Sequence, residues 1–252
     1  MKVLFIGDVF GESGMKALQK YLPKLKMDHK PNMIFLNGEN VHKGHGISKK
    51  LYKELMSMGI SVITMGNHTF RTKELLEFID DSKIIRPANY PKTVKGKGYI
   101  TVKYNDKSVT VINVLGRIFM GDSMNNPFDA LDEILEHTDS DYIFVDVHAE
   151  ATSEKLAIAH YLDGRVTAVL GTHTHVPTAD NITLPKGTMY ITDIGMTGSL
   201  HGIIGADRDM ILRKFLTGLP ARIEEHKEGP LQLNAVVIDT NMSTIKRINI
   251  FE

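Results

Sequence analysis

The chain has no cysteine among its 252 residues. This absence excludes disulfide bonds, thiolate zinc sites and cysteine nucleophiles. An excess of charge of one sign is also missing, because 30 lysines and arginines balance 30 aspartates and glutamates to a formal net charge of +0. A protein that binds nucleic acid without specificity needs a strong positive excess. Any nucleotide is therefore expected to bind at a local site, and sequence-specific DNA binding is not expected.

Long hydrophobic runs are scarce as well. The N-terminal run is apolar only from Val3 to Ile6, before Gly7 and Asp8. It is too short for the core of a signal peptide and fits a first β-strand. No run approaches the length of a membrane span. We therefore expect a cytoplasmic protein with no membrane partner.

The chain alternates short apolar runs with helical patterns. The runs are rich in Val, Ile, Leu, Phe and Met and end in glycine or polar residues, which is typical of strands buried on both faces. They are KVLFIGD, MIFLNGEN, VITMGNH, VTVINVLGR, YIFVDVHAE, VTAVLGTHTH, MYITDIG and NAVVIDT. Helical stretches at 13–27, 48–58 and 72–80 lie between the early runs. This alternation predicts an α/β protein with a largely parallel sheet.

Two later segments show a different pattern. Residues 96–114 form two alternating runs around Asn105-Asp106, and residues 232–251 repeat that arrangement, so each segment predicts a β-hairpin. Parallel strands early and antiparallel strands later predict a mixed sandwich of two sheets with helices outside. No internal repeat, low-complexity segment or linker divides the sequence. We therefore expect a single domain over residues 1–252.

Side chains with oxygen or imidazole ligand atoms follow five of the predicted strands. In an α/β sheet, ligands bind beyond the carboxyl ends of the strands, because the loops there converge. The candidates are Asp8, Glu39, Asn40, Asn67, His68, His148, His173 and His175. Each has an ordinary explanation when taken alone, such as a turn residue for Asp8 or a core histidine for His148. Their coincidence at five strand ends favours one shared site.

A dinuclear metal centre accounts for this set. Imidazole together with carboxylate suits Mn, Fe and Zn, whereas an all-oxygen cage would suit Mg or Ca. Two ions about 3.5–4 Å apart need a bridging carboxylate and ligands from several directions. Neutral imidazoles and amides with only two carboxylates leave about two positive charges uncancelled on a divalent pair, so the centre attracts an anion such as phosphate. His173 and His175, in GTHTHVP, are each expected to bind one ion.

The order of these residues resembles the calcineurin-like metallophosphoesterases, whose pattern is D-x-H, G-D, G-N-H, H and G-H-x-H. Here the pattern reads Asp8, NGEN, GNH, His148 and GTHTH. Two positions depart from it: Phe10 stands in place of the first-motif histidine, and Glu39 in place of the bridging aspartate. These departures, with GDVFG, RPANYP, HAEATSEK and DIGMTG, resemble the bacterial YmdB-like phosphodiesterases. The similarity extends over nearly the whole chain.

The resemblance implies a four-layer α/β/β/α metallophosphoesterase sandwich with two mixed β-sheets. It also implies two ligand sets that share Glu39 as a bridge, with Asn40 in place of the missing histidine. One set is Asp8, Glu39, Asn40 and His175, and the other is Glu39, Asn67, His148 and His173. The resemblance further implies iron or manganese as the metals, and hydrolysis of 2',3'-cyclic nucleotides to 3'-nucleotides.

The expected mechanism follows from the charges. A hydroxide that bridges the metals would attack phosphorus in line, because metal coordination lowers the pKa of water. The leaving alkoxide needs a proton, and His68, next to Asn67, is the candidate general acid. The alternative is that His68 only hydrogen-bonds phosphate or supports Asn67. His42 and His45, in a glycine-rich segment without P-loop spacing, are candidate substrate-binding residues.

Two alternative functions have to be weighed. An amidohydrolase also uses a His-x-His pair, but there the pair follows the first strand, whereas His173 and His175 come late in this sequence. A regulatory protein of the same fold would keep the metals and bind a nucleotide or a partner with little turnover. As partner we expect a small-molecule cyclic nucleotide or an RNA-derived phosphodiester, and the sequence is compatible with a homo-oligomer.

Overall fold

The larger of two facing β-sheets contains the N-terminal strand. The structure is a computed structural model that describes residues 1–121, 124–220, 222 and 224–252. The strands of this sheet are β1 (Lys2–Ile6), β2 (Asp8–Val9), β3 (Met33–Asn37), β4 (Val62–Thr64), β5 (Ile84–Ile85), β12 (Met196–Ser199), β13 (Leu231–Asp239) and β14 (Thr244–Phe251). Their order is β2-β12-β13-β1-β3-β4-β5, and β14 pairs with β13. β1, β3 and β4 are parallel, and β13 is antiparallel to β1, so the sheet is mixed.

The smaller sheet is also mixed. Its strands are β6 (Tyr99–Tyr104), β7 (Lys107–Leu115), β8 (Tyr142–His148), β9 (Ala168–Thr172), β10 (Ile182–Thr183) and β11 (Met189–Ile191). Their order is β10-β11-β9-β8-β7-β6. β7, β8 and β9 run parallel, whereas β6 and β7 form an antiparallel hairpin.

Alternating side chains along the strands divide the core into layers. In β1, Leu4 packs with side chains of the outer helices, whereas Phe5 packs between the two sheets. In β8, Phe144 contributes to the same intersheet core, and Val145 packs toward the helices on the other side. Successive side chains of a strand point to opposite faces. The unbroken apolar runs of the sequence are therefore explained by strands that are buried on both faces.

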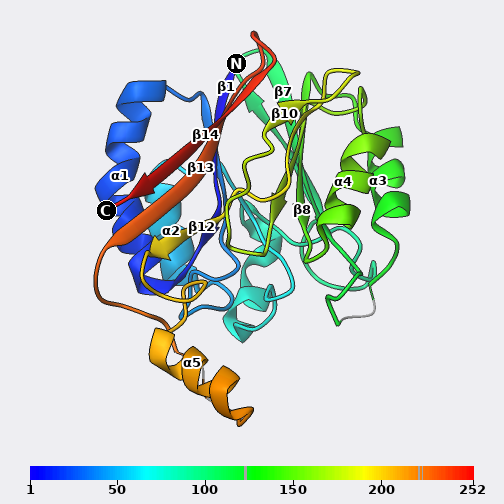
Figure 1. Cartoon of the computed structure of the whole chain (residues 1–252). Helices are drawn as coiled ribbons and strands as arrows, with labels where there is room; N and C mark the ends of the chain where they lie inside the picture. Colours follow the sequence, from blue (N-terminus) through cyan, green and yellow to red (C-terminus); the bar gives the residue numbers. More distant parts are fainter. Residues whose placement is uncertain (122–123, 221, 223) are drawn as a thin grey trace.

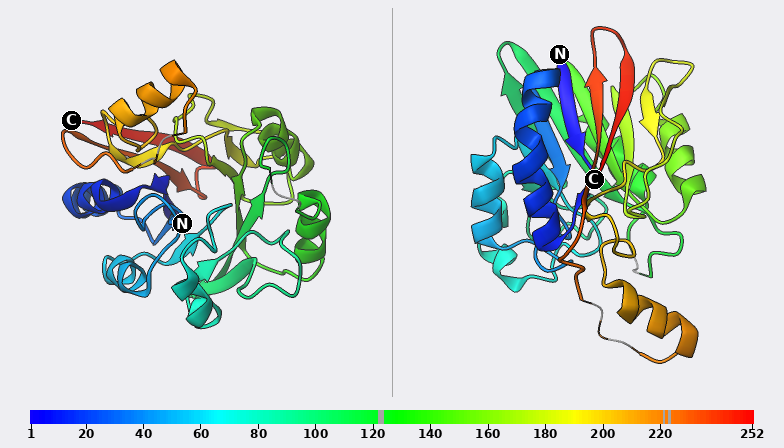
Figure 2. Two further views of the ribbon diagram at one scale, coloured as in Figure 1. Left: turned by 90° about the horizontal axis from the view of Figure 1, so that it is seen from below. Right: turned by 60° about the vertical axis from the view of Figure 1, so that its left-hand side comes forward.

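The structure has five α-helices within its described residues, and four of them cover the outer faces of the sheets. The five are α1 (Gly11–His29), α2 (Lys49–Ser57), α3 (Pro127–Glu136), α4 (Thr152–Tyr161) and α5 (Arg208–Thr217). Figure 1 shows α1 and α2 on one side of the two sheets and α3 and α4 on the other, with α5 projecting from the body. The view from below in Figure 2 shows the same layers end on. The expected four-layer α/β/β/α arrangement is confirmed.

The predicted elements agree with the structure in part. Both predicted hairpins are present, as β6–β7 and β13–β14, and the first two predicted helices are α1 and α2. The predicted helix over 72–80 is wrong, because the chain forms two short 3₁₀ helices instead, η1 (Lys73–Glu77) and η2 (Ile79–Asp81). Phe78 separates them: its φ of −138° leaves the helical region, and its ring is buried in the core. No helix in the described ranges is both long and apolar enough to cross a membrane.

Candidate metal centre

The predicted ligands lie where the carboxyl ends of strands from the two sheets meet. Because the central strands of each sheet are parallel, the loops that follow them emerge at one end. The larger sheet contributes Asp8, Glu39, Asn40 and Asn67, and the smaller sheet contributes His148, His173 and His175. The structure therefore brings together side chains that are up to 167 positions apart in the sequence.

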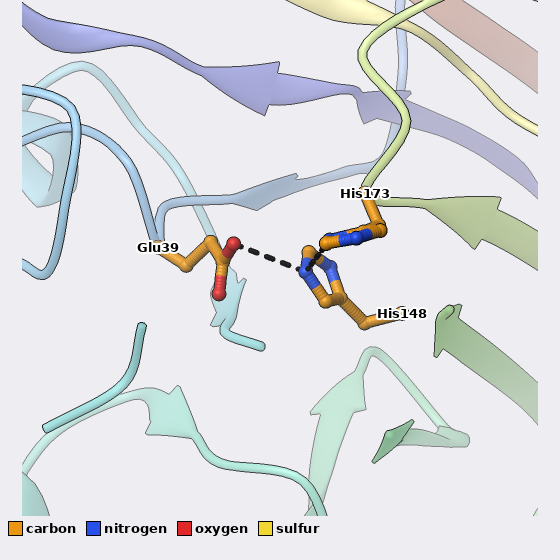
Figure 3. Close-up of side chains that lie close together, drawn as sticks. All are labelled: Glu39, His148 and His173. Carbon is orange, nitrogen blue, oxygen red and sulfur yellow. Dashed lines mark hydrogen bonds and ion pairs between the residues drawn. The ribbon is translucent and has the colours of Figure 1, made fainter. Parts of the chain in front are cut away.

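Three ligand atoms converge on Nε2 of His148. Its Nε2 lies 3.0 Å from Glu39 Oε1, 3.1 Å from Asn67 Oδ1 and 3.0 Å from His173 Nδ1. Figure 3 shows the Glu39 carboxylate and the two imidazole rings pointing toward one another. Ligand atoms of Glu39, His148 and His173 all lie within 4.8 Å of one another. These four residues are the set expected for one metal ion.

The hydrogen bonds of His148 leave its Nε2 free to bind a metal. Its Nδ1 lies 2.9 Å from the Thr172 hydroxyl, and that hydroxyl donates its single hydrogen to Asp146 Oδ1 at 2.7 Å. The Thr172 oxygen must therefore accept from Nδ1–H, which leaves the lone pair of the neutral ring on Nε2. Asp146 is fully buried and also accepts hydrogen bonds from Thr64 and Asn37.

The other two rings are oriented in the same way. His173 Nε2 lies 3.1 Å from the Glu150 carboxylate, and His175 Nδ1 lies 2.8 Å from the carbonyl oxygen of Ile204. Both oxygens can only accept, so these nitrogens carry the hydrogens. The unprotonated nitrogens, Nδ1 of His173 and Nε2 of His175, then face the site. Orientation of a ligating histidine through its second nitrogen is typical of metal centres.

These lone pairs require a positive charge between them. Burial disfavours the imidazolium of His148, but the carboxylates of Glu39 and Asp8 outweigh it and raise the His148 pKa to about 9. Burial and the neighbouring His148 lower the His173 pKa to about 3. Without metal, His148 is thus protonated on Nε2, and the resulting imidazolium pairs with the Glu39 carboxylate. A divalent cation fits the same position, because every atom around it donates an electron pair.

The second expected ligand set surrounds Asp8. Its Oδ1 is buried and has no hydrogen-bond partner among the described residues, and it lies 3.8 Å from His175 Nε2. Its Oδ2 accepts from the backbone N–H of His173 at 3.2 Å. Burial raises the pKa of Asp8 to about 6, against the opposing effect of the two nearby rings His175 and His148. An orphaned buried carboxylate oxygen facing a bare imidazole nitrogen also fits a cation.

The side chain of Asn40 lies within the second ligand set, but its amide nitrogen, and not its oxygen, faces the other ligands. Its side-chain nitrogen lies 3.0 Å from His175 Nε2 and 3.4 Å from Glu39 Oε1, and its oxygen lies 2.9 Å from His68 Nδ1. Metal ligation by the amide oxygen therefore requires a half-turn of the amide group.

Phe10, which stands where the family pattern has a histidine, leaves no gap in the site. Its ring packs edge-on against His175, with centroids 5.6 Å apart and planes at 78°. Glycines at positive φ lie against the ring on two sides: a Cβ on Gly44 would be 2.8 Å from the ring, and one on Gly205 would be 2.6 Å from it. The aromatic side chain thus packs directly against the His175 ring.

The turn that contains His173 and His175 has a strained backbone. Both residues have positive φ, at 102° and 67°, which costs about 1–3 kcal/mol each for a residue with a side chain. Asp193 Oδ2 holds the turn by accepting from the backbone N–H and the hydroxyl of Thr174, at 3.0 and 2.8 Å. The same oxygen lies 2.7 Å from Lys155 Nζ, and both side chains of this pair are fully buried.

A glycine makes room for the ligands on the opposite side. Gly66 precedes Asn67, and a Cβ there would lie 2.3 Å from a His148 ring carbon and 2.4 Å from Glu39 Oε2. Any side chain at this position would therefore separate the carboxylate from the ring. These short distances explain on steric grounds why the GNH motif begins with glycine.

His68 lies beside both ligand sets. Its backbone N–H donates to Glu39 Oε2 at 2.9 Å, and its ring lines a cavity of about 330 Å³. Burial lowers the His68 pKa below its usual value, so the neutral ring predominates at neutral pH. His45 lines the same cavity. His42 does not: it lines a neighbouring cavity of about 540 Å³ between α1 and α2.

Several residues that support the proposed ligands were not predicted from the sequence. Asp146 carries a usable signal, since a lone carboxylate inside the apolar run YIFVDV is seldom buried without a partner. Lys155 and Asp193 carry no such signal, because they come from separate loops and helices 38 positions apart. Glu154, in the same HAEATSEK segment, accepts from the backbone N–H groups of Arg117 and Ile118 and so fixes that loop rather than a metal ligand.

Comparison with known proteins first defines the class. The structure of the NAD nucleotidase of Haemophilus influenzae superposes with a TM-score of 0.52 at 14% identity, covering 98% of this chain and 55% of that one. This likeness shows that the chain shares its fold with that nucleotidase. The two facing mixed sheets and the polar strand ends agree with that fold.

Closer relatives define the family. A profile of the YmdB-like protein family matches residues 4–252. A 2',3'-cyclic-nucleotide 2'-phosphodiesterase of Bacillus subtilis is 49% identical over 99% of this chain and 95% of its own length. The crystal structure of a hypothetical protein from Thermus thermophilus superposes with a TM-score of 0.95 at 42% identity and covers both chains completely. The chain belongs to the YmdB-like family.

Proposed function

We propose that this protein is a dinuclear metal-dependent phosphodiesterase that hydrolyses 2',3'-cyclic nucleotides to 3'-nucleotides. The observation that carries the proposal is the convergence of unprotonated ligand atoms, Glu39 Oε1, Asn67 Oδ1 and His173 Nδ1, on His148 Nε2. The activity of the Bacillus subtilis relative names the substrate class. As ligand sets we propose those stated above, with Glu39 as the bridge and iron or manganese as the metals.

When bound, two such ions would lower the pKa of an attacking water to near 7 and offset charge on the phosphoryl oxygens. The chain itself positions the reacting groups. The carbonyl of Ile204 and the Thr172 hydroxyl hold His175 and His148 with their unprotonated nitrogens inward. Burial of Asp8 and Glu39 keeps water away from the carboxylates, which strengthens their attraction for cations.

We propose His68 as the general acid for the leaving 2'-oxygen. Its ring is partly exposed to the cavity, neither ligand set needs it, and its Nδ1 contacts Asn40. Because its pKa is lowered, only a minority of molecules carry the imidazolium at pH 7. Turnover should therefore rise as the pH falls toward this pKa, until protons displace the metals.

One domain over residues 1–252 is part of the proposal. Side chains of both sheets share the intersheet core, for example Phe35 of β3 and Phe144 of β8, whose rings lie 5.6 Å apart. The proposed ligands also come from both sheets, so neither sheet carries the site alone.

Product analysis with purified enzyme tests the function. Metal-free protein should have no activity on 2',3'-cyclic AMP, and Mn²⁺ or anaerobic Fe²⁺ should restore it. Chromatography should then show 3'-AMP as the product, with little hydrolysis of 3',5'-cyclic AMP. A protein that binds both metals and 2',3'-cyclic AMP but releases no product would instead be the regulatory protein described above. Formation of 2'-AMP would contradict the proposed direction of bond cleavage.

A further inference from the structure

The cavity beside His68 extends the site away from the ligand sets. It has a volume of about 330 Å³ and is lined by Phe10, Lys43, His45, His68, Arg71 and Glu225, among others. Known small-molecule sites begin at about this size. A nucleotide whose cyclic phosphate lies at the ligand sets can therefore place the rest of the molecule in this cavity.

Two cations at the cavity have no carboxylate partner. Among the described residues, no ion pair includes Lys43 or Arg71. Arg71 follows His68 closely, and its backbone N–H donates to the His68 carbonyl at 3.0 Å. The guanidinium thus belongs to the same turn as the proposed general acid.

The two acidic residues of the cavity are engaged elsewhere. Glu225 accepts from the backbone N–H of Ser13 at 2.8 Å, in the first turn of α1, where the N-cap Phe10 offers no side-chain acceptor. Glu224 pairs with Arg222 at 3.4 Å. The hydrogen bond to a neutral N–H leaves the charge of Glu225 in place, but Lys43 and Arg71 outnumber this one carboxylate, so the cavity keeps a positive excess.

We propose that Lys43 and Arg71 bind a second phosphate of the substrate, carried on its 5'-oxygen. The inference rests on the proposed function: once the cyclic phosphate occupies the 2'- and 3'-oxygens of a ribose, the 5'-oxygen is the position left for another phosphate. A guanidinium and an ammonium group are the side chains that recognise phosphate best. The substrate class is then a 2',3'-cyclic nucleotide with a 5'-phosphate, either free or as the 3' end of RNA.

Competition between substrates tests this inference. We would compare kcat/KM for 2',3'-cyclic AMP, for the same nucleotide with a 5'-phosphate, and for the dinucleotide that ends in the same cyclic phosphate. The 5'-phosphorylated substrate should be preferred over the 5'-hydroxyl one about tenfold, the worth of one charge-assisted hydrogen bond. An equal preference for the dinucleotide means that any 5'-phosphate suffices, and a larger one identifies an RNA end as the source.

Matched variants locate the effect. Arg71→Met together with Lys43→Met should reduce the preference ratio to about one, whereas Lys73→Met removes a nearby charge outside this cavity and should keep the ratio. A wild-type ratio near one, with normal hydrolysis of 2',3'-cyclic AMP, overturns the second phosphate site but leaves the proposed function intact. A preference that survives in the double variant overturns the assignment to these two residues. Failure of all three substrates contradicts the proposed function instead.

Discussion

Replacing Lys155 by methionine should destabilise the metal-free protein by ~3 kcal/mol. Lys155 Nζ lies 2.7 Å from Asp193 Oδ2, and both side chains are fully buried. Without the ammonium group, the carboxylate keeps its hydrogen bonds from Thr174 and Gly195 but loses its counter-charge. Removing one partner of a buried pair costs about 3–5 kcal/mol, and the retained hydrogen bonds place this case at the lower end.

Urea unfolding followed by circular dichroism measures this free energy. The double variant Lys155→Met with Asp193→Asn should recover part of the loss, since it leaves no buried charge unpaired. The solvent-exposed pair of Lys107 and Asp141, at 2.9 Å, provides a control, and Lys107→Met should hardly shift the midpoint. A loss for Lys155→Met as small as that of the control would refute the reasoning.

The same substitution should weaken metal binding. Asp193 holds the strained turn through Thr174, which stands between His173 and His175. Without its counter-charge, Asp193 is held less firmly in this position, so the turn that it supports becomes less rigid and both histidines lose part of their orientation toward the site. Calorimetric titration of the folded variant with Mn²⁺ should therefore show lower affinity than wild type. Unchanged affinity would mean that the pair stabilises the fold alone.

Three further predictions concern the ligand sets and His68. Asn40→Ala should weaken the metal held with Asp8 more than the other, measured by stepwise metal titration; equal loss of both would contradict the two sets. His68→Ala should retain both metals and lose about 10²–10⁴ in turnover of cyclic nucleotides, with a smaller loss for a nitrophenyl phosphodiester, and an equal loss would exclude the acid role. The His148 pKa is about 9 in the folded protein and about 6.5 in the unfolded chain. Its imidazolium therefore stabilises the metal-free protein fully below pH 6.5, and this contribution to stability is lost as the pH rises through 9. Metal binding at pH 8 should accordingly release about one proton, detected by calorimetry in two buffers, and no release would refute this assignment.

The convergence of the ligands could be predicted because strand direction determines it. Glu39 and His148 each follow an apolar run directly, and parallel strands bring such positions to one end of a sheet. The periodicity of each strand could not show that the two sheets face each other. The apolar runs around Phe5 and Phe144 would look the same if these two side chains did not share a core. The change from parallel to antiparallel patterns along the chain predicted a sandwich of two sheets, and the resemblance to a family supplied its four-layer order.

The supports of the site were harder to predict because they depend on tertiary packing. Lys155 lies on a helix, where a lysine usually faces solvent, and only the fold brings it to Asp193. The amide orientation of Asn40 depends on contacts with His68 and His175, which come from different sheets. The segment 72–80 shows helical spacing, but the backbone of Phe78 leaves the helical region and the segment forms two short 3₁₀ helices.

The proposed dinuclear centre depends on one carboxylate, Glu39, that would bridge the two metal ions. Elemental analysis of anaerobically purified protein tests it most directly, with Glu39→Gln beside the wild type and Glu133→Gln, at an exposed helix position, as the control. We expect two ions per chain for the wild type and the control, and one or none for Glu39→Gln. Two ions per chain in Glu39→Gln, or fewer than two in the wild type, would contradict it.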